Sequence, residues 1–289
     1  MKLLDIITSP WAISPECLSE IRQVYATHLK GEKVEWEKIQ ASIDSFGAAQ
    51  ASGLYTIQDG VALIPITGPI TKGSSFMSFL IGGADVDDIS ASFDAAVRDE
   101  SVKSIMLLVH SPGGSVLGVQ ELATQIYEAR AQKPIMTYCD GIMASAAMWI
   151  GAAAHEVYIS GQTNTIGHIG VILTHYTDNW EDETKFYAGK YKHIDAGGEL
   201  NEEDKGILQS RVDYLYSIFV SDIAKFRGVS VEAVISTMAE GRVFLGQQSV
   251  EAGLVDGIRT FDQAHGSIGE MAEYQAFSKV NATLKGVRI

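Results

Sequence analysis

Residues 104–115 read SIMLLVHSPGGS, and this stretch decides the fold class. The unbroken apolar run from Ile105 to Val109 is typical of a strand that is buried on both faces of a sheet. The Pro-Gly-Gly turn at 112–114 ends the strand, and residues 116–131 follow a helical pattern. A buried strand, a tight turn and a helix in succession indicate an α/β domain with a largely parallel sheet.

The same alternation extends to both sides of this stretch. Strands are expected at 61–66, 134–138 and 157–159, and helices at 86–97 and 145–154. The most apolar run, Ile142 to Ala154, is shorter than the roughly 18 residues of a membrane span and predicts a buried helix.

The chain divides into three segments. Residues 1–50 predict an N-terminal helical segment, because apolar residues recur at helical spacing after Ser14. Residues 51–265 form the main domain, which ends in a long helix from 201 to 223 with an acidic first turn and a shorter helix from 231 to 238. Residues 266–289 show no clear pattern and are expected to form a tail.

The composition excludes several classes of partner. The formal net charge is -14 and the basic residues form no cluster, which argues against nucleic acid and acidic membranes. Asp5 and Pro10 interrupt the apolar start that a signal peptide would need. Cys17 and Cys139 suit neither a disulfide framework nor a metal site, so a cytoplasmic protein without metal or cofactor is expected.

Two glycine-rich or serine-bearing turns are candidates for chemistry. At 110–115 paired glycines let backbone N–H groups approach a ligand and stabilise an oxyanion, although the motif also suits a plain turn. At 141–147, read GIMASAA, Ser145 opens an apolar helix directly after a strand. Small neighbours and a helix N-terminus favour a nucleophile there, while a simple helix cap is the alternative.

The third candidate is the polar loop GKYKH at 189–193. A lysine acts as a general base only where burial or a nearby cation lowers its pKa. A solvated basic loop is the ordinary alternative.

In this order, the three pieces resemble the signal peptide peptidase A family of Ser–Lys serine proteases, over about residues 55 to 262. The resemblance continues in LNEEDK at 200–205, and in GRVFLG at 241–246 through AGLVD at 252–256. It implies an α/β fold like the Clp protease and crotonase spiral of strand–helix units. It also implies ring-like homo-oligomers, some of which build each site from neighbouring subunits.

Carried onto this chain, the resemblance makes Ser145 the nucleophile and Lys192 its general base. Lys192 is preferred to Lys190 because the family's lysine stands three residues after a glycine, as Lys192 does after Gly189. Gly114 and the backbone N–H of Ser145 would form the oxyanion hole, supported by Gly113.

One position departs from the family pattern. In TIGHIG, residues 165–170, His168 stands where the family usually has a serine that orients the lysine. His168 either takes over that role or is itself the base, as in the Ser–His–Asp arrangement of the related Clp proteases. A merely packed histidine is the third alternative.

With no membrane anchor expected and with an extra N-terminal segment, the chain resembles phage head-maturation proteases of the lambda protein C type. The expected function is therefore a serine endopeptidase that cleaves capsid and scaffold proteins, acting in the host cytoplasm or the procapsid. A host cytosolic peptidase, an inactive protease-like scaffold protein and a crotonase-type acyl-CoA enzyme are the alternatives.

Overall fold

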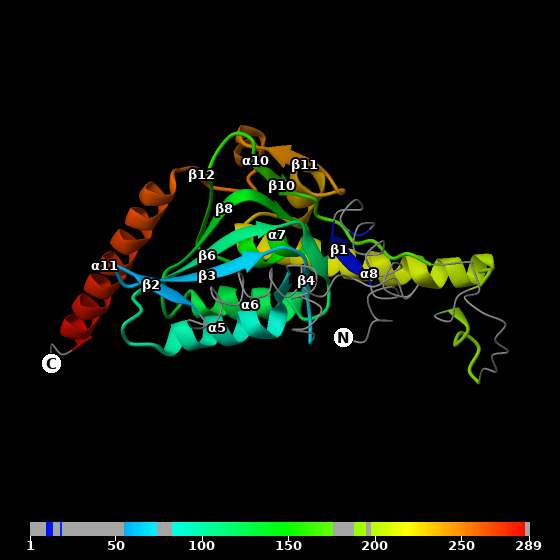
Figure 1. Ribbon diagram of the computed structural model, residues 1–289, viewed down its shortest axis with the longest axis horizontal. Coiled ribbons are helices and arrows are strands. Elements are labelled where there is room, and N and C mark those ends of the chain that lie inside the picture. The colour runs from blue at the N-terminus through cyan, green and yellow to red at the C-terminus, as the bar shows by residue number, and fades with distance from the viewer. Residues whose placement is uncertain are drawn as a thin grey trace, which may run out of the picture.

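The computed structural model describes residues 10–13, 18, 55–73, 83–175, 188–194 and 198–286. Its central sheet has the strand order β11-β10-β8-β6-β3-β2, with β9 paired to β8 and β12 paired to β9 (Figure 1). The neighbours β3, β6, β8, β9 and β10 pair in parallel, as the sequence predicts. The strands are β2 Thr56–Gln58, β3 Val61–Thr67, β6 Ser104–Ser111, β8 Ile135–Ala144, β9 Glu156–Ile159, β10 Thr165–Gly167, β11 Val243–Leu245 and β12 Gly257–Ile258.

Side chains that alternate along β3 and β6 enter two different cores. Ile64 and Leu107 belong to the larger core, which α5 (Val86–Arg98), α6 (Val119–Ala129), α7 (Ala146–Gly151) and α8 (Glu202–Arg227) cover. Leu63 and Met106 point to the opposite face and pack in a smaller cluster with Ala264 and Ile268 of α11 (Phe261–Gly286). Helices on both faces explain why β6 is apolar from Ile105 to Val109.

A second, smaller sheet crosses the carboxyl end of β6. Its order is β1-β7-β4-β5, made from Trp11–Ile13, Gly113–Ser115, Ile70–Thr71 and Ala84–Asp85. The strand β7 contains both glycines of the Pro-Gly-Gly turn and follows β6 directly, so it links the two sheets. The α5 helix follows β5 directly, capped by Asp85, whose side chain accepts a hydrogen bond from the N–H of Asp87.

Three sequence expectations need correction or restriction. Residues 142–144 continue β8 instead of starting the buried helix, which begins only at Ala146. The patternless 266–289 region is helical up to Gly286, because α11 runs through the expected boundary at 265. Trp11–Ile13 form a strand, although Leu18 is helical; the rest of the predicted N-terminal helical segment lies outside the described residues.

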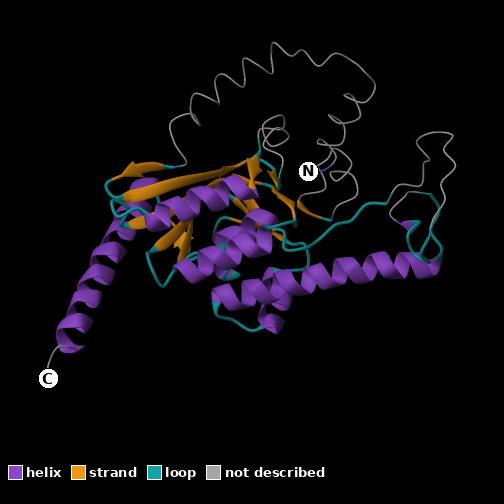
Figure 2. Ribbon diagram, turned by 90° about the horizontal axis from the view of Figure 1, so that it is seen from below, coloured by secondary structure: helices purple, strands orange, loops and turns teal. Residues whose placement is uncertain are grey.

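Two long helices project from the body of the molecule in different directions, as Figures 1 and 2 show for α8 and α11. The first turn of α8 carries a capping box, in which Asn201 and Asp204 satisfy each other's backbone N–H groups. Within the part of the chain that is described, no helix combines the length and the apolar character needed to cross a bilayer. Cys139 is buried and forms no disulfide.

Candidate active site

Ser145 occupies a strained turn between β8 and α7. Its φ of 55° and ψ of -118° are unfavourable for a residue with a side chain, and its relative exposure is 0%. Ala144, Ala146 and Ala147 are buried around it. A sharp strand-to-helix turn of this kind presents a nucleophilic serine in other hydrolase folds, so the local geometry suits attack on a carbonyl.

The glycine turn of β7 lies directly against Ser145. A Cβ built on Gly113 would come within 2.9 Å of Ser145 Cβ, and Gly113 has a φ of 100°. A Cβ on Gly114 would lie 1.9 Å from the carbonyl oxygen of Ile70 on the neighbouring strand. Both positions therefore require glycine, for conformation at one and for space at the other.

The hydrogen bonds of the turn decide which N–H groups remain for an oxyanion. The Ser145 N–H, one of the two expected donors, instead donates to the carbonyl of Gly167 at 2.8 Å. The Gly113 N–H donates to Ser111 Oγ at 3.2 Å. Ser145 Oγ itself makes one long contact, 3.4 Å to the carbonyl of Gly170.

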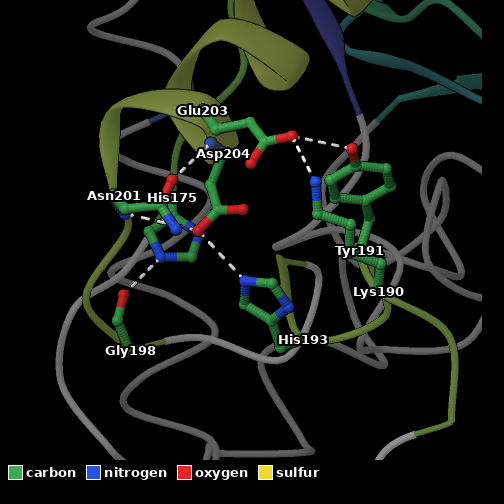
Figure 3. A network of polar contacts seen from close by, with 8 residues as sticks. All are labelled: His175, Lys190, Tyr191, His193, Gly198, Asn201, Glu203 and Asp204. Carbon is green, nitrogen blue, oxygen red and sulfur yellow. Dashed lines mark hydrogen bonds and ion pairs between the residues drawn. The ribbon is translucent and has the colours of Figure 1, made fainter.

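The loop that carries the two candidate lysines is held against the N-terminus of α8 (Figure 3). Lys190 Nζ lies 2.6 Å from Glu203 Oε1, and the hydroxyl of Tyr191 donates to the same oxygen at 2.7 Å. His193 Nε2 lies 3.0 Å from Asp204 Oδ2. The hydrogen bond to Glu203 is the main cause that raises the pKa of Lys190, so this ammonium is a poor proton acceptor.

Lys192 differs from Lys190 in its surroundings. Its N–H closes a turn onto the carbonyl of Gly189 at 3.1 Å, and Gly189 has a φ of 104° that favours glycine. The side chain of Lys192 is exposed, and among the described residues no carboxylate pairs with it. Lys192 is therefore presented outward by a fixed turn.

No hydrogen bond or ion pair joins Lys192 to Ser145 among the described residues. The Ser145 helix is fastened to the C-terminal half of α8, where Trp149 stacks on Phe219. At about 1.5 Å per residue, Glu203 lies roughly 24 Å along the helix axis from Phe219. Figures 1 and 2 show this N-terminal end of α8 projecting beyond the sheets.

His168 lies beside the site through its backbone. It follows Gly167, whose carbonyl binds the Ser145 N–H, and its own N–H donates to the carbonyl of Arg242 at 2.7 Å. No contact joins its ring to Ser145 among the described residues, and its Nδ1 is buried without a hydrogen-bond partner there. Within the described residues, His168 therefore makes no direct contact with the Ser145 hydroxyl.

With this geometry in view, comparison with known proteins assigns the chain to a family. The model of peptidase family S49 matches residues 128–275, slightly more than half of the chain. The chain belongs to peptidase family S49. The Clp protease model matches residues 83–168, which confirms the expected Clp-like fold of strand–helix units.

Curated relatives of this S49 chain include phage and bacterial proteins. The head-tail preconnector protein GP5 of Enterobacteria phage P21 is 33% identical, over 73% of this chain and 43% of its own. Capsid assembly protease C of Escherichia phage lambda is 29% identical, over 74% and 49%. Protease 4 of Salmonella typhi is 29% identical, over 74% and 35%. The alignment spans less than half the length of each relative.

Sequence reasoning missed two features of the site. One is the strand at Trp11–Ile13, which lies against the glycine turn and was hidden in a region of helical spacing. The other is the network of Glu203 and Asp204, which gives the two lysines different surroundings. The acidic first turn of α8 was visible in the sequence, but its use as an anchor for 190–193 depends on how the chain folds back.

Proposed function

We propose that the protein is a serine endopeptidase in which Ser145 is the nucleophile and Lys192 of a second copy of the chain is the general base. The observation that carries the first part is the strained turn at Ser145, packed against paired glycines in a chain of family S49. The second part rests on the turn that presents Lys192 outward, at the projecting end of α8.

The exposed half of α8 supports an assembly of several chains. Tyr214 is a large side chain that is 68% exposed on this stretch, while its neighbours Leu215 and Ile218 pack against the chain's own core. An assembly would cover this stretch and carry Lys192 toward the next subunit's Ser145. A head-to-tail contact of this kind gives a ring when the rotation between neighbouring subunits closes, which would produce the ring-like homo-oligomer expected from the resemblance.

The oxyanion hole is proposed to consist of the N–H groups of Gly114 and Ala146; Gly114 is paired with Ala12 in this structure, so its N–H becomes a free donor when Ala12 moves away. Ala146 takes the place expected for Ser145, whose N–H is engaged by Gly167. As the first residue of α7, Ala146 has no acceptor for its N–H within the helix. The residue after the nucleophile supplies a donor in the same way at other strand-to-helix nucleophile turns.

The reaction then follows ordinary acyl transfer. Ser145 Oγ attacks the substrate carbonyl as its proton passes to neutral Lys192 Nζ, and the carbonyl oxygen becomes an oxyanion facing Gly114 and Ala146. The protonated amine gives its proton to the leaving nitrogen, and water cleaves the ester. The unpaired Nδ1 of His168 is a suitable acceptor to orient the incoming ammonium, which matches its expected supporting role.

Capsid and scaffold proteins are the proposed substrates, in the host cytoplasm or the procapsid interior. The support is the identity of two relatives, a head-tail preconnector protein and a capsid assembly protease. Incubation with the capsid and scaffold proteins encoded beside this chain should give defined fragments, which Ser145→Ala abolishes. Cleavage of unrelated host proteins in preference to these would favour a host peptidase.

Mixing two inactive variants tests the shared site. Ser145→Ala and Lys192→Ala chains should each be inactive, and co-assembly at equal amounts should restore about a quarter of the activity if each site joins two neighbouring copies. No recovery in a mixture shown to co-assemble would place both groups in one chain. Activity in Ser145→Ala alone would remove the nucleophile assignment.

A further inference from the structure

The strand β1 crosses the candidate active site from the chain's own N-terminal segment. It pairs antiparallel with β7, with Ala12 opposite Gly114. On its other edge, the N–H and C=O of Trp11 each hydrogen-bond to Ile172 at 2.8 Å. The strand is therefore held on both edges, between the glycine turn and the segment that follows β10.

The direction of its backbone groups places one carbonyl next to Ser145. Successive strand residues point their N–H and C=O groups to opposite sides, so those of Ala12 face β7 when those of Trp11 face Ile172. A Cβ built on Gly113 would lie 2.3 Å from the Ala12 oxygen and 2.9 Å from Ser145 Cβ. The Ala12 carbonyl and the Ser145 side chain thus meet at the same point of the turn.

Burial shows that this strand closes the site. Ser145 and Ala12 are both 0% exposed, and Trp11 and Ile13 are each 1% exposed. A nucleophile without exposed surface cannot meet a substrate chain. An extended peptide that adds to open strand edges would need the same two edges that β1 now fills.

We propose that residues 10–13 are a built-in occupant of the peptide-binding groove and keep Ser145 covered until they are displaced. The proposal rests on the peptidase function above for the identity of the groove. Its ligand is an extended peptide held through its main chain, with an alanine-sized residue at the carbonyl that faces Ser145, because Ala12 is enclosed in the main core.

The size of β1 makes displacement feasible. It has three residues, and a substrate strand can reproduce its main-chain hydrogen bonds to β7 and Ile172. The buried Trp11 and Ile13 side chains also hold it, so a competing strand must fill their places as well. A segment of the same chain competes at high effective concentration, so free peptide enters only in proportion to the open fraction.

A binding experiment tests occupancy without catalysis. In the Ser145→Ala chain, Ala12→Pro removes a strand N–H and should loosen β1. A fluorescent peptide of residues 8–15, TSPWAISP, should then bind at least about tenfold tighter than to the chain that keeps Ala12, since the groove is open more often. Ile57→Pro, in the exposed edge strand β2, is the matched control and should change nothing.

The peptide carries its own control. A version with tryptophan at the Ala12 position should not bind, because that position is fully enclosed. Equal binding of TSPWAISP to the Ala12 and Ala12→Pro chains, with circular dichroism showing both folded, would overturn the proposal.

A reversible lock covers the case in which Ala12→Pro fails to fold. Residues directly opposite in an antiparallel pair have Cα atoms about 4.5–5.5 Å apart, which a disulfide can span. Trp11→Cys with Ile172→Cys, on a Cys17→Ser background, should block labelling of Ser145 by a fluorophosphonate when oxidised and permit it when reduced. Equal labelling in both states, with the disulfide verified, contradicts the proposal.

The two readouts separate this inference from the peptidase assignment. Suppose that the fluorophosphonate labels neither the reduced double-cysteine protein nor the natural protein, while Ala12→Pro still strengthens peptide binding. The groove and its occupant are then supported, and the assignment of Ser145 as the nucleophile is wrong. If Ser145 is labelled equally with β1 locked or released, the peptidase assignment stands and the occupant falls.

Discussion

The indole ring of Trp149 stacks on the phenyl ring of Phe219, with centroids 4.3 Å apart and planes 6° from parallel. Trp149 Nε1 also donates to Asp222 Oδ2 at 2.9 Å. Trp149 lies one turn beyond Ser145 on α7, while Phe219 and Asp222 belong to α8, whose other end holds the Lys192 loop. This pair ties the helix of the proposed nucleophile to the helix that presents the proposed base.

Phe219→Ala should therefore weaken both the fold and the assembly of the site. Removing a fully buried aromatic ring typically costs about 3–5 kcal/mol of unfolding free energy. Urea titration measures this loss. Tyr214→Ala on the same helix is the control, because Tyr214 is 68% exposed and surface changes usually stay within about 0.5 kcal/mol. A similar loss in both variants would mean that the stack has no special role.

Gly114→Ala should abolish peptide hydrolysis. The added methyl would lie 1.9 Å from the Ile70 oxygen, so β7 must shift and the Gly114 N–H moves with it. Loss of one oxyanion donor costs on the order of a hundredfold or more in kcat. Gly161→Ala, where a Cβ meets nothing within 4 Å, should retain activity. Unchanged kinetics in Gly114→Ala would mean that the glycine pair only forms a turn and has no role in catalysis.

Lys192→Arg should be as inactive as Lys192→Ala, because a guanidinium stays protonated and cannot accept the Ser145 proton. Lys190→Arg is the matched control and should retain most activity, since arginine keeps the ion pair with Glu203. Steady-state kinetics on one peptide substrate compares the variants. If Lys192→Arg is active and Lys190→Arg is inactive, Lys190 and not Lys192 is the general base.

His168 separates a lysine base from a histidine base. His168→Ala should weaken hydrolysis only partly, and His168→Ser should recover much of the loss, because a hydroxyl also accepts a hydrogen bond from an ammonium. The same kinetic assay applies. If His168→Ala is dead while Lys192→Ala keeps substantial activity, the site works through an imidazole, as in Clp proteases.

The ion pair of His193 and Asp204 makes the order of the lysine loop depend on pH. The hydrogen bond that His193 donates to Asp204 raises the pKa of His193 above 6.5 and lowers the pKa of Asp204 below 3.8. The stabilisation is therefore complete between these two values. It is lost as pH rises through the raised pKa of His193, and as pH falls through the lowered pKa of Asp204.

Hydrogen exchange of the amides at 189–193 measures this effect. Protection, corrected for intrinsic exchange, should fall as pH rises above 6.5, through the raised pKa of His193, in the natural chain. His193→Gln should show no such step, because its amide does not titrate. Identical pH profiles for the two chains would exclude the ion pair as the anchor of the loop.

Much of the fold was readable from local patterns. The run Ile105–Val109 is β6, the acidic turn at 201–204 caps α8, and the strand at 61–66 is β3, because each pattern reflects burial or capping within a few residues. The start of α7 was misplaced, since residues 142–144 are as apolar in a strand as in a helix. The C-terminal helix was missed because most of α11 projects from the body, so it lacks a periodic apolar face.

The sequence by itself determined the family, the α/β alternation and the chemical identity of Ser145, the glycine pair and the lysine loop, because motifs are runs of neighbouring residues. Only the tertiary structure decided how these groups meet. The Ser145 N–H is taken by Gly167, Lys190 is held by Glu203, and Trp11–Ile13 pair with the glycine turn of β7. These contacts join residues 13 to more than 100 positions apart, and no local pattern encodes the geometry that brings such residues together.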